Sequence, residues 1–176
     1  IMDRAELDAQ SVFYEKQSFR QWWIWLILLG VDGIFVVGAI LQLFMGRQFG
    51  DNPMPDFVLI LVCGVILFSS FLFYSIHLET RICWDGIYVR FFPFHFKYKI
   101  FYWDTIKKCY VREYAPVKEY GGWGIRNSLN GRKKAYNISG NQGIQLEFTD
   151  GKNLLIGTQK VDEVINTLKY LKRWKA

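Results

Sequence analysis

The fold is decided by two long apolar stretches in the first half of the chain. One is residues 22–44, WWIWLILLGVDGIFVVGAILQLF, whose single charge is Asp32; the other is residues 57–78, FVLILVCGVILFSSFLFYSIHL, which has no charge when His77 is neutral. As an α-helix, each would be about 33–35 Å long, enough to cross a hydrocarbon core about 30 Å thick. The alternative is two helices buried in a soluble core, but a chain of 176 residues leaves too little protein to surround them. The stretches therefore predict two transmembrane helices.

The segment between the stretches, residues 45–56, has the composition of a turn. It contains the helix-breaking residues Gly46, Gly50, Pro53 and Pro55. So short a link between two spans allows only an antiparallel hairpin. We therefore expect three parts, which are an N-terminal segment at residues 1–21, a helical hairpin at residues 22–78 and a separate domain at residues 79–176.

Basic residues predict the orientation of this hairpin. Residues 45–56 contain one Lys or Arg, whereas residues 1–21 contain three and residues 79–176 contain eighteen. Because cytoplasmic flanks of membrane spans carry an excess of Lys and Arg, both termini are expected in the cytoplasm and the loop outside it. Tryptophans fall at the expected cytoplasmic boundary, where indole rings favour the headgroup layer: Trp22, Trp23 and Trp25.

Residues 79–176 have the alternating pattern of short β-strands. Asp-Gly pairs at 85–86 and 150–151 predict two hairpins, because a left-handed turn accepts glycine readily. The predicted hairpins cover residues 81–92 and 143–157, and further strands are expected at residues 95–103, 105–114 and 134–139. The end of the chain is predicted to be helical, because apolar residues recur there at three- and four-residue steps: Val161, Val164, Ile165, Leu168 and Leu171. This pattern predicts a small curved sheet or open barrel of about six or seven strands, closed by a C-terminal helix.

The order of these elements resembles the bacterial membrane proteins that carry a pleckstrin-homology-like domain. The resemblance covers residues 22–171 and rests on five short motifs in order: CWDGI at 83–87, YWDTI at 102–106, GGWGIR at 121–126, GIQLEFTDG at 143–151 and LIGT at 155–158. It implies a membrane α+β fold in the bacterial inner membrane, with an antiparallel two-helix transmembrane hairpin followed by a small pleckstrin-homology-like β domain. Most members of this broad group have no assigned activity, so the resemblance implies fold and topology rather than a reaction.

Side-chain patterns typical of enzymes are missing from the sequence. His77 and His95 have no second His, Cys or carboxylate at metal-ligand spacing, and the three cysteines form no C-x-x-C pair. The glycines at 121–124 match neither a dinucleotide fingerprint nor a phosphate-binding loop. We therefore expect no catalytic residue, no cofactor and no metal site. No segment resembles a recognition helix, so nucleic acid is not an expected partner.

A glycine-rich loop is one candidate binding site. It contains Gly121, Gly122, Trp123, Gly124 and Arg126. In one interpretation the glycines only let the backbone take positive φ angles. In the other, the loop presents Trp123 and Arg126 to a protein partner.

A basic turn is a second candidate site, formed by Arg132, Lys133 and Lys134 after the Asn130-Gly131 pair. Residues 79–176 carry 18 basic and nine acidic residues, a net charge of +9. The turn is either part of the general cytoplasmic positive bias or a surface that attracts anionic lipid headgroups, at about 1 kcal/mol per nearby cation.

Asp32 is a candidate intramembrane contact, because a carboxylate near mid-bilayer costs about 2.5–3.5 kcal/mol unless it is neutralised or paired. In an antiparallel hairpin, Ser69 and Ser70 lie at a similar depth. Either a neutral Asp32 is hydrogen-bonded to one of these hydroxyls, or Asp32 pairs with a basic side chain of another subunit.

These observations leave two main hypotheses. In the first, the chain is a non-enzymatic integral membrane protein whose β domain docks a protein partner or stabilises a larger membrane complex, with another membrane protein or a second copy of the chain as its partner. In the second, the domain is a membrane-tethered module that reads anionic lipid headgroups. An enzyme or a transporter is a weaker third, because the spans contain few polar groups.

Overall fold

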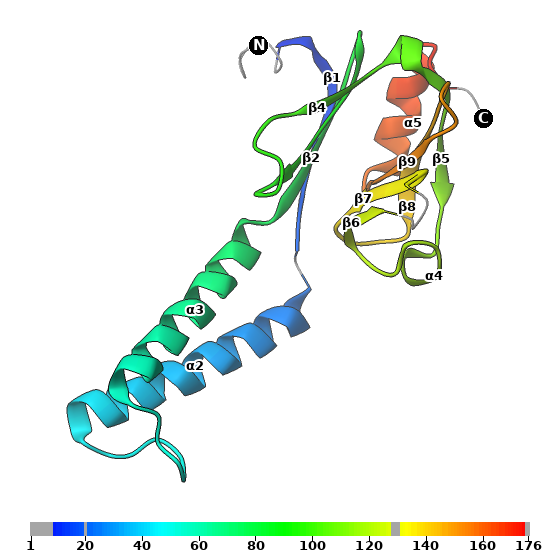
Figure 1. Ribbon diagram of the computed structural model, residues 1–176. Helices are drawn as coiled ribbons and strands as arrows, with labels where there is room; N and C mark the ends of the chain where they lie inside the picture. The colour runs from blue at the N-terminus through cyan, green and yellow to red at the C-terminus, as the bar shows by residue number, and fades with distance from the viewer. Residues whose placement is uncertain (1–8, 20, 128–130, 175–176) are drawn as a thin grey trace. The chain divides into compact units, whose positions relative to one another are not determined.

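The computed structural model describes residues 9–19, 21–127 and 131–174. The chain separates into two compact units, both drawn in Figure 1. The helical unit is Phe19–Ser75, and the β unit combines the residues up to Ser18 with those from Ile76 onward.

The helical unit consists of α2 (Trp22–Met45) and α3 (Asp56–Ser75), which are both long and apolar enough to cross a membrane. The Cys63 thiol donates to the Phe35 carbonyl at 3.3 Å, and Gln42 Nε2 donates to the Met54 carbonyl at 2.8 Å. Later positions of α2 thus meet earlier positions of α3, so the helices run antiparallel. The loop folds back on α2 at Gly38, where any Cβ would lie 2.7 Å from the Phe49 ring.

The second helix is shorter than the sequence pattern indicated. α3 ends at Ser75, whereas the apolar stretch was predicted to continue to residue 78. The reason is that His77 and Leu78 already belong to strand β2 (His77–Cys83), where they are paired with neighbouring strands on both sides.

The first sheet of the β unit contains four antiparallel strands in the order β1-β2-β3-β4. Its other strands are β1 (Ser11–Ser18), β3 (Gly86–Phe92) and β4 (Lys99–Tyr102). The predicted Asp85-Gly86 turn joins β2 to β3. The strand expected at residues 95–103 is reduced to the four residues of β4.

Strand β1 was not predicted from the sequence, since residues 1–21 were assigned no secondary structure. Phe13, Glu15 and Gln17 alternate as its buried positions, so two of its three buried side chains are polar. Both polar side chains form hydrogen bonds with residues in the second half of the chain. Glu15 accepts hydrogen bonds from the Thr158 hydroxyl at 2.6 Å and from the Gln159 N–H at 2.8 Å, and Gln17 Nε2 donates to the Gly157 carbonyl at 2.7 Å.

The second sheet contains five strands in the order β5-β8-β9-β7-β6. Its neighbours are antiparallel except for β7 and β9, which are parallel. The strands are β5 (Ile106–Glu113), β6 (Gly124–Asn127), β7 (Lys133–Asn137), β8 (Gln142–Phe148) and β9 (Asn153–Gly157). The described part of the unit also contains the helices η1 (Trp103–Thr105), α4 (Pro116–Tyr120) and the C-terminal α5 (Val161–Tyr170).

The β unit is therefore α+β with a C-terminal helix, as expected, but its described strands form two separate sheets that do not close into a barrel. Strands β2, β3, β8 and β9 build the buried core with runs of consecutive buried positions, and α5 adds Val164 and Leu168. The fully buried apolar residues of the strands include Ile82, Ile87, Val89, Ile144, Leu146, Leu155 and Ile156.

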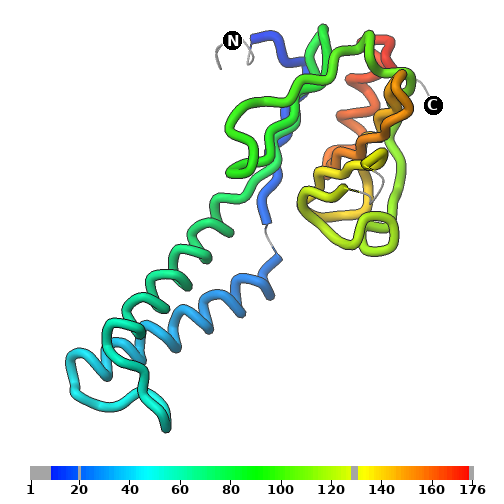
Figure 2. The backbone as a smooth tube through the Cα atoms, viewed as in Figure 1, coloured from blue at the N-terminus to red at the C-terminus, as the bar shows by residue number. Residues whose placement is uncertain are grey.

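The helical unit is inserted in the chain between two paired strands. β1 ends at Ser18 and β2 begins at His77, and these two residues are partners in the sheet register. Figure 2 shows the two strands side by side along the first sheet. The chain thus leaves the sheet for the helices and re-enters it at the same end.

Candidate functional site

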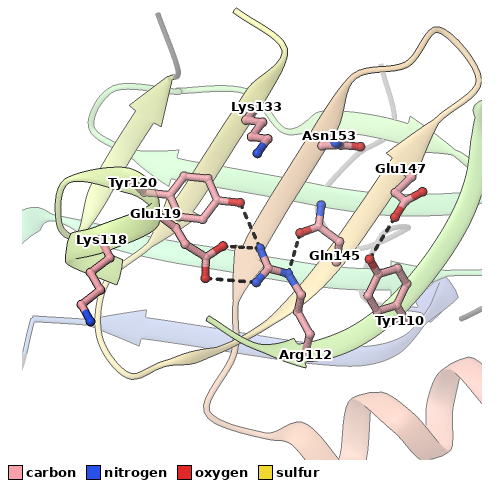
Figure 3. A pocket seen from close by; sticks show the side chains of 9 residues that line it. All are labelled: Tyr110, Arg112, Lys118, Glu119, Tyr120, Lys133, Gln145, Glu147 and Asn153. Atoms are coloured by element: carbon pink, nitrogen blue, oxygen red, sulfur yellow. Dashed lines mark hydrogen bonds and ion pairs between the residues drawn. The ribbon is translucent and has the colours of Figure 1, made fainter. Parts of the chain in front are cut away.

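A hollow lies on one face of the second sheet, beside α4. It has a volume of about 510 Å³ and is polar. Its lining residues, all labelled in Figure 3, are Tyr110, Arg112, Lys118, Glu119, Tyr120, Lys133, Gln145, Glu147 and Asn153. We call it the polar hollow.

Arg112 lies at the middle of the polar hollow, and its guanidinium already has partners (Figure 3). It donates to both carboxylate oxygens of Glu119, at 2.7 and 3.2 Å, and to the Gln145 side-chain oxygen at 3.0 Å. The hydrogen bonds from Arg112 lower the pKa of Glu119. This pairing fastens α4 to β5 and consumes most of the guanidinium's donors, so the hollow offers a surface of mixed charge rather than a free cation.

A second, smaller cleft is lined by residues of β4 in the first sheet and of β7, β8 and β9 in the second. Its volume is about 150 Å³. It is lined by three lysines and three aromatic rings, with Gly131, Asn153 and Leu154 beside them: Lys99, Lys134, Lys152, Phe101, Tyr136 and Phe148. We call it the lysine cleft.

The lysines of this cleft are exposed and weakly engaged. Lys99 Nζ donates to the Tyr136 hydroxyl at 3.1 Å, and Lys152 Nζ lies 2.6 Å from an oxygen of Asp150. The Lys152–Asp150 pair is more than half exposed on both sides, so water and salt screen it. A cleft lined by three cationic and three aromatic side chains can hold an anionic group such as a phosphate.

The structure splits the basic turn that the sequence placed together. Lys133 and Lys134 are consecutive residues of β7, and consecutive side chains of a strand point to opposite faces. Lys133 lines the polar hollow and Lys134 lines the lysine cleft, with Arg132 just before the strand. The Asn130 position of the predicted turn lies outside the described residues.

The glycine-rich loop connects α4 to β6 and is held by its own hydrogen bonds. Gly121, Gly122 and Gly124 all have positive φ, between 72° and 119°, which explains why glycine is needed there. Trp123 is 39% exposed, and its indole N–H donates to the Gly140 carbonyl at 3.2 Å. Arg126 Nε donates back to the Trp123 carbonyl at 3.0 Å. The loop therefore holds a partly exposed indole ring in a fixed position.

In the helical unit, one of the two candidate serines contacts Asp32. The Ser70 hydroxyl donates to Asp32 Oδ1 at 3.1 Å, whereas the Ser69 hydroxyl donates to the Ile66 carbonyl of its own helix at 2.7 Å. Gly30 and Gly33 lie on the α2 face that α3 does not cover, where an added Cβ would meet nothing within 4 Å.

Sequence reasoning missed a buried charged cluster on the first sheet. Glu79 and Arg81 are almost completely buried. The Glu79 carboxylate accepts from Arg90 at 2.7 Å and from the Tyr98 hydroxyl, and the Arg81 guanidinium lies 4.5 Å from the centre of the Tyr14 ring. Burial alone would raise the pKa of Glu79, but the bonds from Tyr98 and Arg90 outweigh it and the pKa lies below its ordinary value. The signal in the sequence was the i, i+2 spacing of Glu79 and Arg81, which puts both on one face of a strand.

None of these sites has the composition of a metal centre. Among residues 9–19, 21–127 and 131–174, no group of three His, Cys, Asp or Glu side chains is placed to hold a metal ion. The Cys83 and Cys109 thiols are buried, and burial raises their pKa to about 11 and about 12. They are therefore protonated and poorly reactive at neutral pH.

Comparison with known proteins adds no assignment: no protein-family model matches the chain, and no curated protein is significantly similar to it.

Proposed function

We propose that this chain is a non-enzymatic integral membrane protein of the bacterial inner membrane, with a cytoplasmic β unit of pleckstrin-homology-like fold. The β unit docks a protein partner or stabilises a larger membrane assembly.

Exposed apolar surface supports the membrane location. Within the helical unit only Gly38, Leu59 and Cys63 of α2 and α3 are buried, and large side chains such as Leu26, Ile34, Phe68 and Phe71 are exposed. Each such side chain gains about 1.5–3 kcal/mol on leaving water, so a lipid environment is strongly favoured over solvent. A core helix of a soluble protein would instead be mostly buried.

The pairing of Ser18 with His77 is the observation that carries the proposal for the β unit. Only Ile76 separates α3 from β2, and three residues separate β1 from α2. Since an extended chain spans at most about 3.3–3.6 Å per residue, both connections hold this end of the first sheet close to the membrane surface. Because β1 and β2 belong to one folded unit, they share one side of the membrane, and the eighteen basic residues after residue 78 favour the cytoplasmic side.

The uncovered face of α2 supports a partner within the membrane. Gly30 and Gly33 point away from α3, and small residues let a second helix approach closely. Asp32, one residue from Gly33, receives a hydrogen bond from Ser70, yet a carboxylate accepts more than one. Another transmembrane segment at this face would supply the remaining partners.

Photo-crosslinking of the full chain in its native membrane tests this proposal. A crosslinking amino acid at Gly33 should give a discrete protein adduct, either with a second copy of the chain or with one partner. The matched control is Val31, which is also exposed and lies within one turn of Gly33 but points about 160° around the helix from it. Adducts with lipid alone at both positions would overturn intramembrane docking.

The lysine cleft favours a second candidate function, the reading of anionic lipid headgroups. It gathers three of the chain's basic residues in one place, Lys99, Lys134 and Lys152. At about 1 kcal/mol per cation, replacing all three with Gln should weaken retention of phosphatidylglycerol on the order of a hundredfold. Native mass spectrometry of the full chain measures this retention.

The control for this test replaces three exposed lysines elsewhere, Lys107, Lys118 and Lys169, and so makes the same change in net charge. Equal losses in both variants would mean that lipid binds by overall charge and not at the cleft.

A further inference from the structure

The connection between β3 and β4, residues 93–98, exposes two aromatic rings to solvent. Its sequence is PFHFKY, and Phe94 and Phe96 are 63% and 75% exposed. Neighbouring positions on the strands before it are buried, as at Phe91. We call residues 93–98 the aromatic loop. Two large exposed apolar side chains in one six-residue loop indicate a surface that is covered in the functional state.

The aromatic loop lies at the end of the sheet where the chain connects to the helices. β3 ends at Phe92, which is the register partner of His77, and His77 in turn is the partner of Ser18. The loop begins at the next residue, Pro93. Figure 1 shows this loop beside the beginning of β2 and away from the Asp85-Gly86 turn. Two residues after Ser75 the chain is thus already in β2, whose first residue pairs with the last residue of β3 before the loop.

The loop is braced by ring contacts and a backbone hydrogen bond. The Phe92 ring stacks on His77 at 5.1 Å between ring centres, and Phe96 packs edge-on against Phe92 at 5.7 Å. The His95 N–H donates to the Phe91 carbonyl at 2.7 Å. Because the backbone is held, little conformational entropy remains to be lost when the rings are buried.

The charges around the two rings match an anionic membrane surface. Lys97 and Lys99 are the charged residues of the loop and of the strand position that follows it, and both are exposed. His95 between the rings has its pKa lowered by burial and by the Lys99 charge, so at neutral pH it stays uncharged. Apolar rings flanked by lysines are the composition of segments that lie in the interfacial layer.

From these observations we infer that the aromatic loop inserts Phe94 and Phe96 into the interfacial layer of the bilayer that α2 and α3 cross. The inference rests on the proposed transmembrane helices. A protein partner is the less favoured occupant, because the short connection at Ile76 brings this end of the sheet to the lipid surface whatever else binds the β unit. Insertion would add a third attachment to the two covalent connections between the β unit and the helices, and it would fix the tilt of the β unit on the membrane.

The test measures the depth of a fluorescent label in nanodiscs whose lipids carry an acyl-chain quencher. The full chain is labelled at Lys97→Cys, which leaves both phenylalanines in place. Selective labelling is helped by the high pKa of the buried Cys83 and Cys109 thiols. Two reference variants are labelled in the same way: Ile27→Cys within α2, and Asp104→Cys in η1, which follows the far end of β4.

We expect strong quenching at Lys97→Cys and Ile27→Cys and little at Asp104→Cys. Adding Phe94→Ser and Phe96→Ser to Lys97→Cys should lower its quenching to the Asp104→Cys level. If quenching persists without the two rings, the short tether alone explains it and insertion is overturned.

If Ile27→Cys is quenched and Lys97→Cys is not, the helices cross the bilayer but the loop does not insert, and a protein becomes the occupant to seek. If Ile27→Cys itself is not quenched, the transmembrane proposal fails first and this inference fails with it.

Discussion

Glu79 and Arg90 are register partners on β2 and β3, and the Arg90 guanidinium donates to the buried Glu79 carboxylate at 2.7 Å. Tyr98 donates to the same carboxylate from the aromatic loop, and His77 Nε2 lies 3.3 Å from its other oxygen. The carboxylate thus ties together both strands and the loop that we propose to insert in the membrane. An ion pair at this depth is worth most as a positioning device, because removing one partner leaves a buried charge.

We predict that Arg90→Ala destabilises the β unit by about 2–4 kcal/mol, because Glu79 then keeps only Tyr98 and His77 as partners. Thermal or urea unfolding of the full chain in detergent measures the change. Lys107→Ala, at an exposed position of β5, serves as the control and should stay within about 0.5 kcal/mol. Equal stabilities of the two variants would show that the buried pair is not stabilising.

The His95 imidazole predicts a loss of stability in mild acid. Burial, with the charge of Lys99, lowers its folded-state pKa below the ordinary value of 6.5. The unfolded chain therefore takes up the proton first, so the free energy of unfolding should fall as the pH drops from about 6.5 toward the folded pKa. His95→Gln should flatten this fall. Glu79 and Glu119 do not interfere, because their pKa values are lowered from 4.5 and they titrate in stronger acid. An unchanged slope in His95→Gln between pH 7 and 5 would contradict the assignment.

The Ser18–His77 pair predicts that the helical unit can be removed without unfolding the β unit. Replacing residues 19–76 by the two-residue turn Asn-Gly would join β1 to β2 as an ordinary hairpin. We expect a soluble protein with cooperative unfolding, measured by circular dichroism. A matched version that begins at His77 lacks β1, loses the bonds that Glu15 makes to Thr158 and Gln159, and should unfold at a clearly lower temperature or not fold at all. Equal melting temperatures would mean that β1 is dispensable.

The sequence predicted correctly the turns and the helix that are marked by a short run of neighbouring residues. The Asp-Gly pairs at 85–86 and 150–151 marked real turns, and the apolar spacing from Val161 marked α5. β1 was missed because its partner strand begins 59 residues after it ends and because its buried positions include Glu15 and Gln17, whose partners lie in the last quarter of the chain. Long-range partners of this kind leave no periodic signal.

For the candidate sites, too, the sequence predicted what depends on position along a helix and missed what depends on long-range contacts. In an antiparallel hairpin, the positions of Asp32 and Ser70 along their helices predicted that they lie at a similar depth. In the structure the two side chains are hydrogen-bonded. Lys133 and Lys134 were read as one patch because they are adjacent in sequence, whereas the pleat of β7 sends them to different cavities. The lysine cleft needed Lys99 and Lys134 to meet from two sheets, which only the tertiary fold reveals.

Asp32 provides the last prediction, because its surroundings within the helical unit are incomplete. Ser70 fills one acceptor site of the carboxylate at 3.1 Å, and the neighbouring Gly33 face is open. If another transmembrane segment completes the site, Asp32→Leu strands that segment's polar group in the membrane, at a cost of about 1–3 kcal/mol, and assembly should weaken about tenfold or more.

Ser70→Ala is the matched control, since it removes the internal bond and leaves the outward acceptor sites intact, so assembly should persist. Native mass spectrometry of both variants in nanodiscs, with melting temperatures recorded alongside, separates the cases. A carboxylate that contacts only its own hairpin would instead make Asp32→Leu more stable, by up to about 2.5–3.5 kcal/mol, with assembly undiminished.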